Sequence, residues 1–268
     1  MNENGDKFEA KYGVLTPELE ELRQLLLDHE VKEVTMESTS IYWHPVWRVL
    51  EGVGTLKLVN PYFIKQLPGR KSDVRDAAWI AECTLKDLIR GSFVPDTLVQ
   101  RMRQYNRRIF DLNKAKVYKL TKLDALLQRC NIRISNYVSS TDSRSYKEVV
   151  KLLADGVTSP DKLLTAIHGR TVNRVGKDTL KSALTGVVTE TDIDLIRQYR
   201  EEIELDDKHL KECQEKLTGI CEKEFPREFQ NLQTIPGVKE RTAASILAEI
   251  GADMKMFITA AALVSWCG

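Results

Sequence analysis

A seven-residue repeat of apolar side chains in the C-terminal half of the chain restricts what this sequence can fold into. The repeat consists of Ile196, Ile203, Leu210 and Leu217. Such spacing predicts one long helix over residues 191–224, with an apolar seam that must pack against another helix. Asp206 lies within the seam and interrupts it.

A second segment, residues 95–134, also carries apolar residues at helical intervals and predicts a second long helix. Residues 101–151 are basic, with 13 Lys and Arg against 4 Asp and Glu, a net charge of +9. Residues 189–228 are acidic, with 7 Lys and Arg against 13 Asp and Glu, a net charge of −6. Two long helices separated by short ones predict either an antiparallel hairpin or a dimerising arm, and the pattern leaves both open.

The basic residues along the first long helix have two interpretations. They follow the phosphate backbone of a nucleic acid, or they form the solvated face of a long helix. The net charge of the whole chain is only +1, so the case for a nucleic acid rests on this local segregation. The candidate phosphate contacts are Arg103, Arg107, Lys114 and Lys122.

The N-terminal part of the chain alternates helices with short strands. Helices are predicted from Thr16 to about His29, over residues 42–51 and from Asp73 onward. Strands are predicted over residues 31–37 and 56–60. This order predicts an α/β layer with parallel strands, followed by an all-α region.

Three carboxylates lie at the ends of these elements. Glu37 ends the first strand, while Asp73 and Asp76 are one turn apart at the start of a helix. Carboxylate oxygens are the ligands that Mg²⁺ or Mn²⁺ prefers, and such ions assist phosphoryl transfer. Basic neighbours suited to a polyanion are Arg70, Lys71 and Arg75. The alternative is that the two aspartates only favour the positive end of a helix.

The last segment, residues 229–251, has the pattern of two helices joined by a Pro-Gly turn. A helix-hairpin-helix of this kind directs backbone N–H groups toward a DNA phosphate. Gly237 lies in the turn, and Lys239 stands where such hairpins usually have a second glycine. The alternative is simply two packed helices.

Composition limits the remaining possibilities. With 268 residues, of which 42% are apolar and 29% charged, the chain is long enough for about two domains. Its five cysteines are odd in number and form no C-x-x-C pair, which argues against a disulfide framework and a zinc site. No stretch approaches the roughly 20 apolar residues of a membrane span, so we expect no membrane partner and a cytoplasmic location.

Four sequence blocks follow one another in the N-terminal part: VTMESTSIYWHPVW (34–47), LVNP (58–61), PGRKSDVRDAAWIA (68–81) and SFVP (92–95). In this order, the blocks resemble the DEDD transposases of the insertion-sequence-110 (IS110) family. The resemblance implies an RNase H-like, RuvC-type fold whose acidic tetrad binds divalent metal. Glu37, Asp73 and Asp76 then match the second, third and fourth acids.

Residues 229–268 resemble the start of the family's C-terminal transposase domain. We therefore expect three parts: a RuvC-like domain over 1–95, a coiled-coil-like region over 96–226 and the transposase domain from 227 to 268. No residue upstream of Glu37 matches the family's first Asp, and neither Ser245 nor Ser265 matches its nucleophilic serine. We expect the chain to lack about one strand at its start and the serine loop at its end.

The leading hypothesis is a transposase of a bacterial insertion sequence that binds DNA and a structured guide RNA and catalyses metal-assisted strand exchange as a homo-oligomer. The resemblance implies the guide RNA, and the basic helix is its candidate contact. Without the serine loop, this chain alone is expected not to complete the reaction. Two alternatives are a nucleic-acid-binding fragment without catalysis and a RuvC-like junction nuclease.

Overall fold

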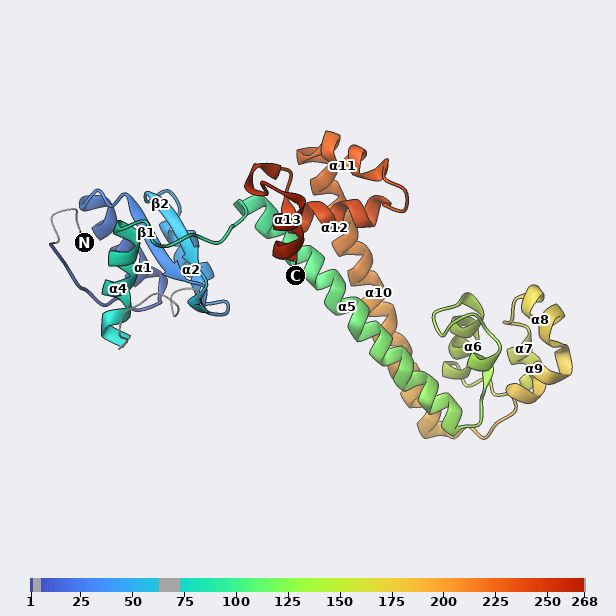
Figure 1. The fold of residues 1–268 in the computed structure, drawn as a ribbon. Helices are drawn as coiled ribbons and strands as arrows, with labels where there is room; N and C mark the ends of the chain where they lie inside the picture. The colour runs from blue at the N-terminus through green and yellow to red at the C-terminus, as the bar shows by residue number, and fades with distance from the viewer. Residues whose placement is uncertain (2–5, 63–72, 268) are drawn as a thin grey trace. The chain divides into compact units, whose positions relative to one another are not determined.

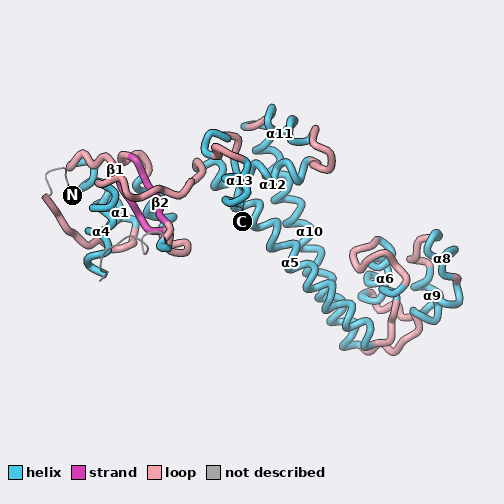
Figure 2. Tube along the Cα trace, viewed as in Figure 1, coloured by secondary structure: helices cyan, strands magenta, loops and turns pink. Residues whose placement is uncertain are grey.

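The structure, a computed structural model, describes residues 1, 6–62 and 73–267. It divides into two units, Met1–Val94 and Pro95–Gly268. Figure 1 shows the ribbon, and Figure 2 shows that the described residues are mainly helical, with strands only in the first unit.

The first unit is built on two parallel strands, β1 (Glu33–Glu37) and β2 (Thr55–Val59). Glu37 lies opposite Val59, so both strands end at the same edge. The parallel pairing confirms the sequence prediction. Among the described residues, the strands are accompanied by the helices α1 (Thr16–Asp28), α2 (Trp43–Leu50) and α4 (Asp73–Leu85).

A small hydrophobic cluster fixes α4 against the strands. Val59 of β2 packs with Ile80 and Cys83 of α4 and with Ile89, which follows the helix. After Ile89 the chain returns to β2, where the Ser92 N–H donates to the Leu58 carbonyl at 2.6 Å. The helix that begins at Asp73 is therefore held along the strand pair.

The second unit is organised by two long antiparallel helices, α5 (Thr97–Arg129) and α10 (Glu190–Glu224), which lie side by side in Figure 1. Their ion pairs show the antiparallel direction. Lys116 pairs with Asp207, whereas Arg129, later in α5, pairs with Asp192, earlier in α10. Of the two arrangements that the sequence left open, the structure forms the hairpin within one chain.

Asp206 lies inside the seam between the two helices, as the sequence predicted. It is only 7% exposed, and Lys119 of α5 donates to its carboxylate at 2.7 Å. A buried charge needs such a partner, because an unpaired one would lose its hydration without compensation. The interruption of the heptad is therefore an ion pair between the helices.

Each end of the hairpin carries a cluster of short helices with its own hydrophobic core. At the connecting end, Leu127, Tyr146, Leu163 and Ile196 belong to one cluster. Its helices are η1 (Ile134–Asn136), α6 (Arg144–Ala154), α7 (Pro160–Leu164), α8 (Gly169–Val175) and α9 (Lys177–Ala183).

At the other end, Met102 of α5 and Leu217 of α10 pack with Phe229 and Leu247. The helices here are α11 (Pro226–Gln233), α12 (Glu240–Ile250), η2 (Met254–Met256) and α13 (Ala260–Cys267). The C-terminal segment therefore shares a core with the two long helices. Among the helices that the structure describes, none is both long and apolar enough to cross a bilayer.

Candidate metal centre and nucleic-acid interface

The predicted acidic residues come from β1 and α4. Glu37 is the last residue of β1 and is half-buried. Asp73 and Asp76 lie in the first turn of α4, but their side chains, like that of Arg75, lie outside the described part of the structure. Arg70 and Lys71 also lie outside the described residues.

Contacts at the far end of α4 fix the direction of this helix. The hydroxyls of Thr84 and Thr35 form a hydrogen bond of 2.8 Å between α4 and the middle of β1. Lys57 Nζ lies 3.0 Å from Glu33, at the start of β1, and 3.6 Å from Asp87, just after α4. The end of α4 therefore lies beside the start of β1, and the first turn of α4 is directed toward the end that carries Glu37.

The chemical type of the three candidate ligands suits a hard divalent cation. All three candidate ligands are carboxylates, the donors that Mg²⁺ and Mn²⁺ prefer. The side chains that the structure describes contain no cluster of three or more His, Cys, Asp or Glu arranged for a metal. Two of the three candidate ligands are not among those side chains.

Two groups of basic residues on α5 differ in their surroundings. Those that face α10 form ion pairs: Lys116 Nζ lies 2.7 Å from Asp207 and 2.9 Å from Asp142, and Lys119 Nζ lies 2.7 Å from Asp206. Burial lowers the pKa of Lys116, but its hydrogen bonds to the two aspartates outweigh burial and raise it above its ordinary value. These lysines stabilise the hairpin.

Arg107, Lys114 and Lys122 form the second group, and all three are exposed. Among the described residues, none of the three forms a salt bridge. The acidic helix α10 therefore neutralises only part of the basic block. The surface of α5 that carries these three residues is called the outer face of α5 below.

Arg103, the remaining candidate on α5, is engaged inside the protein. Its guanidinium donates to the Glu249 carbonyl at 2.5 Å, and Nε lies 3.5 Å from the Glu249 carboxylate. Burial lowers its pKa from the ordinary value. Arg103 thus satisfies a carbonyl in the last turn of α12, a role that basic residues often take at helix ends.

The turn between α11 and α12 is open to solvent. Gly237 has φ +87°, is exposed, and has no atom within 4 Å of the place where a side chain would begin. Lys239 is the exposed cap residue of α12, and its side chain makes no capping hydrogen bond. The backbone at this turn can therefore be approached closely from outside.

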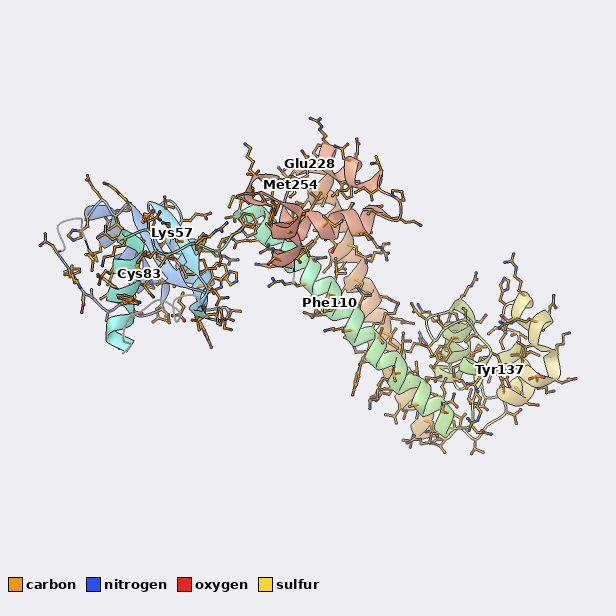
Figure 3. All side chains as sticks on the ribbon, viewed as in Figure 1. Lys57, Cys83, Phe110, Tyr137, Glu228 and Met254 are labelled. Atoms are coloured by element: carbon orange, nitrogen blue, oxygen red, sulfur yellow. The ribbon has the colours of Figure 1, made fainter. Side chains whose placement is uncertain are left out.

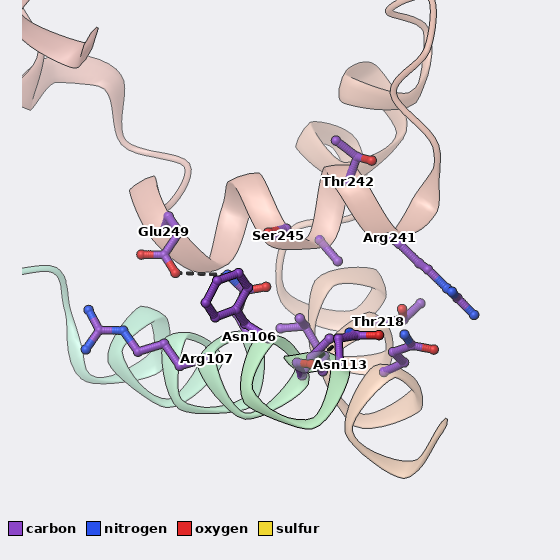
Figure 4. A pocket seen from close by; sticks show the side chains of 13 residues that line it. Asn106, Arg107, Asn113, Thr218, Arg241, Thr242, Ser245 and Glu249 are labelled. Atoms are coloured by element: carbon purple, nitrogen blue, oxygen red, sulfur yellow. Dashed lines mark hydrogen bonds between the residues drawn. The ribbon is translucent and has the colours of Figure 1, made fainter. Parts of the chain in front are cut away.

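A groove of about 570 Å³ lies between α5, α10 and α12 (Figure 4). Arg107 lines it from α5 and Arg241 from α12. Among the described residues that line this groove, Glu249 is the only carboxylate, and it accepts a hydrogen bond of 2.9 Å from Asn106. Neutral polar groups complete the lining: Asn113, Gln214, Thr218, Thr242 and Ser245.

The groove was not predicted from the sequence. Its residues are separated by more than 100 positions, and no local spacing indicates that Asn106 and Arg241 line one cavity. Because its two arginines exceed its one carboxylate, the groove favours an anionic ligand.

Two family models match the chain. One, a DEDD-type IS110 model described as "Transposase", matches residues 1–132, which include Glu37, Asp73 and Asp76. The other, described as "Transposase IS116/IS110/IS902 family", matches residues 229–268. No curated protein matches the chain. Transposases bind DNA, and the DEDD type uses divalent metal. The two matches agree on the family: the chain belongs to the IS110 family of transposases.

Proposed function

We propose that the chain binds DNA and a structured guide RNA and takes part in metal-assisted strand exchange as a homo-oligomer. The binding proposal rests on the difference between two groups of basic residues on α5. Lysines that face α10 are paired with aspartates, whereas Arg107, Lys114 and Lys122 remain exposed. Such an unneutralised row attracts a polyanion.

A second phosphate contact is proposed at the turn between α11 and α12. The open backbone at Gly237 and the exposed side chain of Lys239 suit a phosphate at the start of a helix. Such a contact is independent of sequence, because backbone N–H groups do not distinguish bases. It would anchor the DNA while other groups position the strand to be cut.

For the chemistry, we propose that residues 1–95 form an RNase H-like, RuvC-type domain in which Glu37, Asp73 and Asp76 hold Mg²⁺ or Mn²⁺. The direction of α4, set by the Thr84–Thr35 hydrogen bond together with the contacts of Lys57 at the start of β1 and just after α4, supports this proposal. A divalent cation stabilises developing charge on a phosphate and aligns the displacement. The carboxylates supply its ligands, and basic residues at 70, 71 and 75 offset the charge of the phosphate.

Salt dependence tests the binding proposal. Phosphate neutralisation releases counterions, so the affinity for a DNA duplex should fall steeply with salt. Changing Arg107, Lys114 and Lys122 together to Gln should make the slope of log affinity against log salt shallower by about 2–3 units. Fluorescence anisotropy of a labelled duplex at several salt concentrations measures this slope.

A matched control removes the same number of charges elsewhere in the second unit. Lys208, Lys211 and Lys223 are exposed residues of the acidic helix α10. Changing these three to Gln should leave the slope unchanged. If both triple variants alter the slope equally, the outer face of α5 is only solvated surface.

A further inference from the structure

The outer face of α5 carries aromatic residues as well as basic ones. Phe110 is 60% exposed and Tyr118 is 63% exposed, although both are large hydrophobic side chains. They alternate with lysines at intervals of four residues, in the order Phe110, Lys114, Tyr118 and Lys122. Residues four apart share one face of a helix, so these four form a single row, called the aromatic–lysine ladder here.

Each lysine of the ladder lies against the ring that precedes it. Lys114 Nζ is 4.3 Å from the centroid of Phe110, and Lys122 Nζ is 5.3 Å from that of Tyr118. These cation–π contacts restrain the rings while most of each ring remains in contact with water. Neither ring belongs to the hydrophobic clusters of the hairpin. The rings therefore contribute little to the packing of the fold. Packing does not explain why two large aromatic side chains occupy these exposed positions.

The ladder starts at the groove between α5, α10 and α12. Phe110, labelled in Figure 3, lines this groove together with Arg107. A cationic groove thus continues along α5 as a row in which rings and cations alternate. Alternating stacking surfaces and positive charges are the features with which proteins bind unpaired strands.

We propose that the aromatic–lysine ladder binds a single-stranded segment of nucleic acid, with bases stacked on Phe110 and Tyr118 and phosphates beside the lysines. This inference rests on the proposed nucleic-acid function of the outer face and adds the strandedness of the ligand. DNA and RNA strands share the required chemistry, because stacking on a ring does not depend on the sugar.

The spacing of the rings favours a single strand over a duplex. Eight residues separate them, about 12 Å along the axis at 1.5 Å per residue. Bases of a duplex are stacked on one another at about 3.4 Å, and their faces are covered. Bases that stack on both rings must therefore belong to a strand whose bases are unstacked from each other.

The charge of the ladder argues against a second copy of this chain as its occupant. Two copies joined symmetrically through this face would bring Lys114, Lys122 and Arg107 of each close together. Like charges in such an interface oppose association unless they are neutralised. A polyanion, in contrast, complements the same groups.

Binding of labelled oligo-dT, oligo-rU and a DNA duplex to the full chain tests the proposal. The double change Phe110→Ala and Tyr118→Ala should weaken binding of both single strands by about tenfold for each ring, since stacking contributes to each bound base. Duplex affinity should change by less than about twofold, and the salt slope for every ligand should stay the same, because no charge is removed.

Val117→Ala provides the control, because Val117 is 63% exposed on the same helix but cannot stack with a base. This variant should bind all three ligands as the unchanged chain does. Equal losses for single strand and duplex, or no loss in the double variant, would overturn the ladder proposal. A double variant whose mass in sedimentation falls would show that the rings hold a second copy instead.

The two proposals fail in different ways. An unaltered salt slope after the Arg107, Lys114 and Lys122 changes contradicts the binding function of the outer face. Normal single-strand affinity after the aromatic changes contradicts only the ladder.

Discussion

At the residue scale, Asp192 illustrates how a carboxylate of this acidic helix is used structurally. It lies in the first turn of α10, where it accepts hydrogen bonds from the Thr189 hydroxyl at 2.7 Å and the Thr189 N–H at 3.0 Å. Arg129 donates to it at 2.6 Å. The hydrogen bonds from Thr189, and then that from Arg129, hold the pKa of Asp192 well below its ordinary value.

This depressed pKa predicts a pH-dependent contribution to stability. The unfolded carboxyl has a pKa of about 3.9, and the folded one has a lower pKa. The contribution of Asp192 to stability is therefore complete above the unfolded pKa and is lost as the pH falls through the folded pKa. Asp192→Asn should lower the free energy of unfolding by about 1–2 kcal/mol at neutral pH. Urea unfolding at decreasing pH should show this difference shrinking below about pH 4. A difference that is constant with pH would contradict the assignment.

At the element scale, the pairing of α5 with α10 depends on charge as well as on the apolar seam. Residue spacing located the seam and its interruption at Asp206, but it did not reveal the partner of Asp206. That partner is Lys119, which is 87 positions away in the sequence. Arg103 shows the same limit, because its contact with Glu249 spans 146 positions. The sequence shows that a residue is charged, but only the packed structure shows which group its charge contacts.

The Lys119–Asp206 pair predicts unequal effects of single and double changes. Asp206→Ala leaves Lys119 in the seam without this partner and should lower the free energy of unfolding by about 1–3 kcal/mol. The double change Lys119→Met and Asp206→Leu replaces the pair by apolar side chains and should recover most of that loss. Urea unfolding of the three proteins checks this, and an Asp206→Ala protein as stable as the unchanged chain would contradict a structural role for the pair.

At the scale of the whole molecule, much of the element order could be predicted from periodicity. The parallel strands, the helix beginning at Asp73 and both long helices were expected and are present. The groove lined by Arg107 and Arg241 could not be predicted, because it forms only when three helices from distant segments meet. The exposed rings of the ladder had a local signal in their spacing of four residues from Lys114 and Lys122. That signal gained meaning only once the opposite side of α5 was seen to face α10.

At the same scale, we propose that this member of the transposase family binds a divalent metal at Glu37, Asp73 and Asp76 and is not only a nucleic-acid-binding protein. Calorimetric titration of Mn²⁺ into the protein tests the metal site most directly. The unchanged chain should bind Mn²⁺ weakly, in the high-micromolar to millimolar range of loosely held divalent ions.

Asp73→Asn and Glu37→Gln should each abolish this binding, because each removes a charged ligand. Asp87→Asn is the matched control, since Asp87 follows the opposite end of α4 and pairs with Lys57 at 3.6 Å. It should bind Mn²⁺ as the unchanged chain does. Identical isotherms for the unchanged chain and Asp73→Asn would contradict the metal site and leave only the nucleic-acid-binding function.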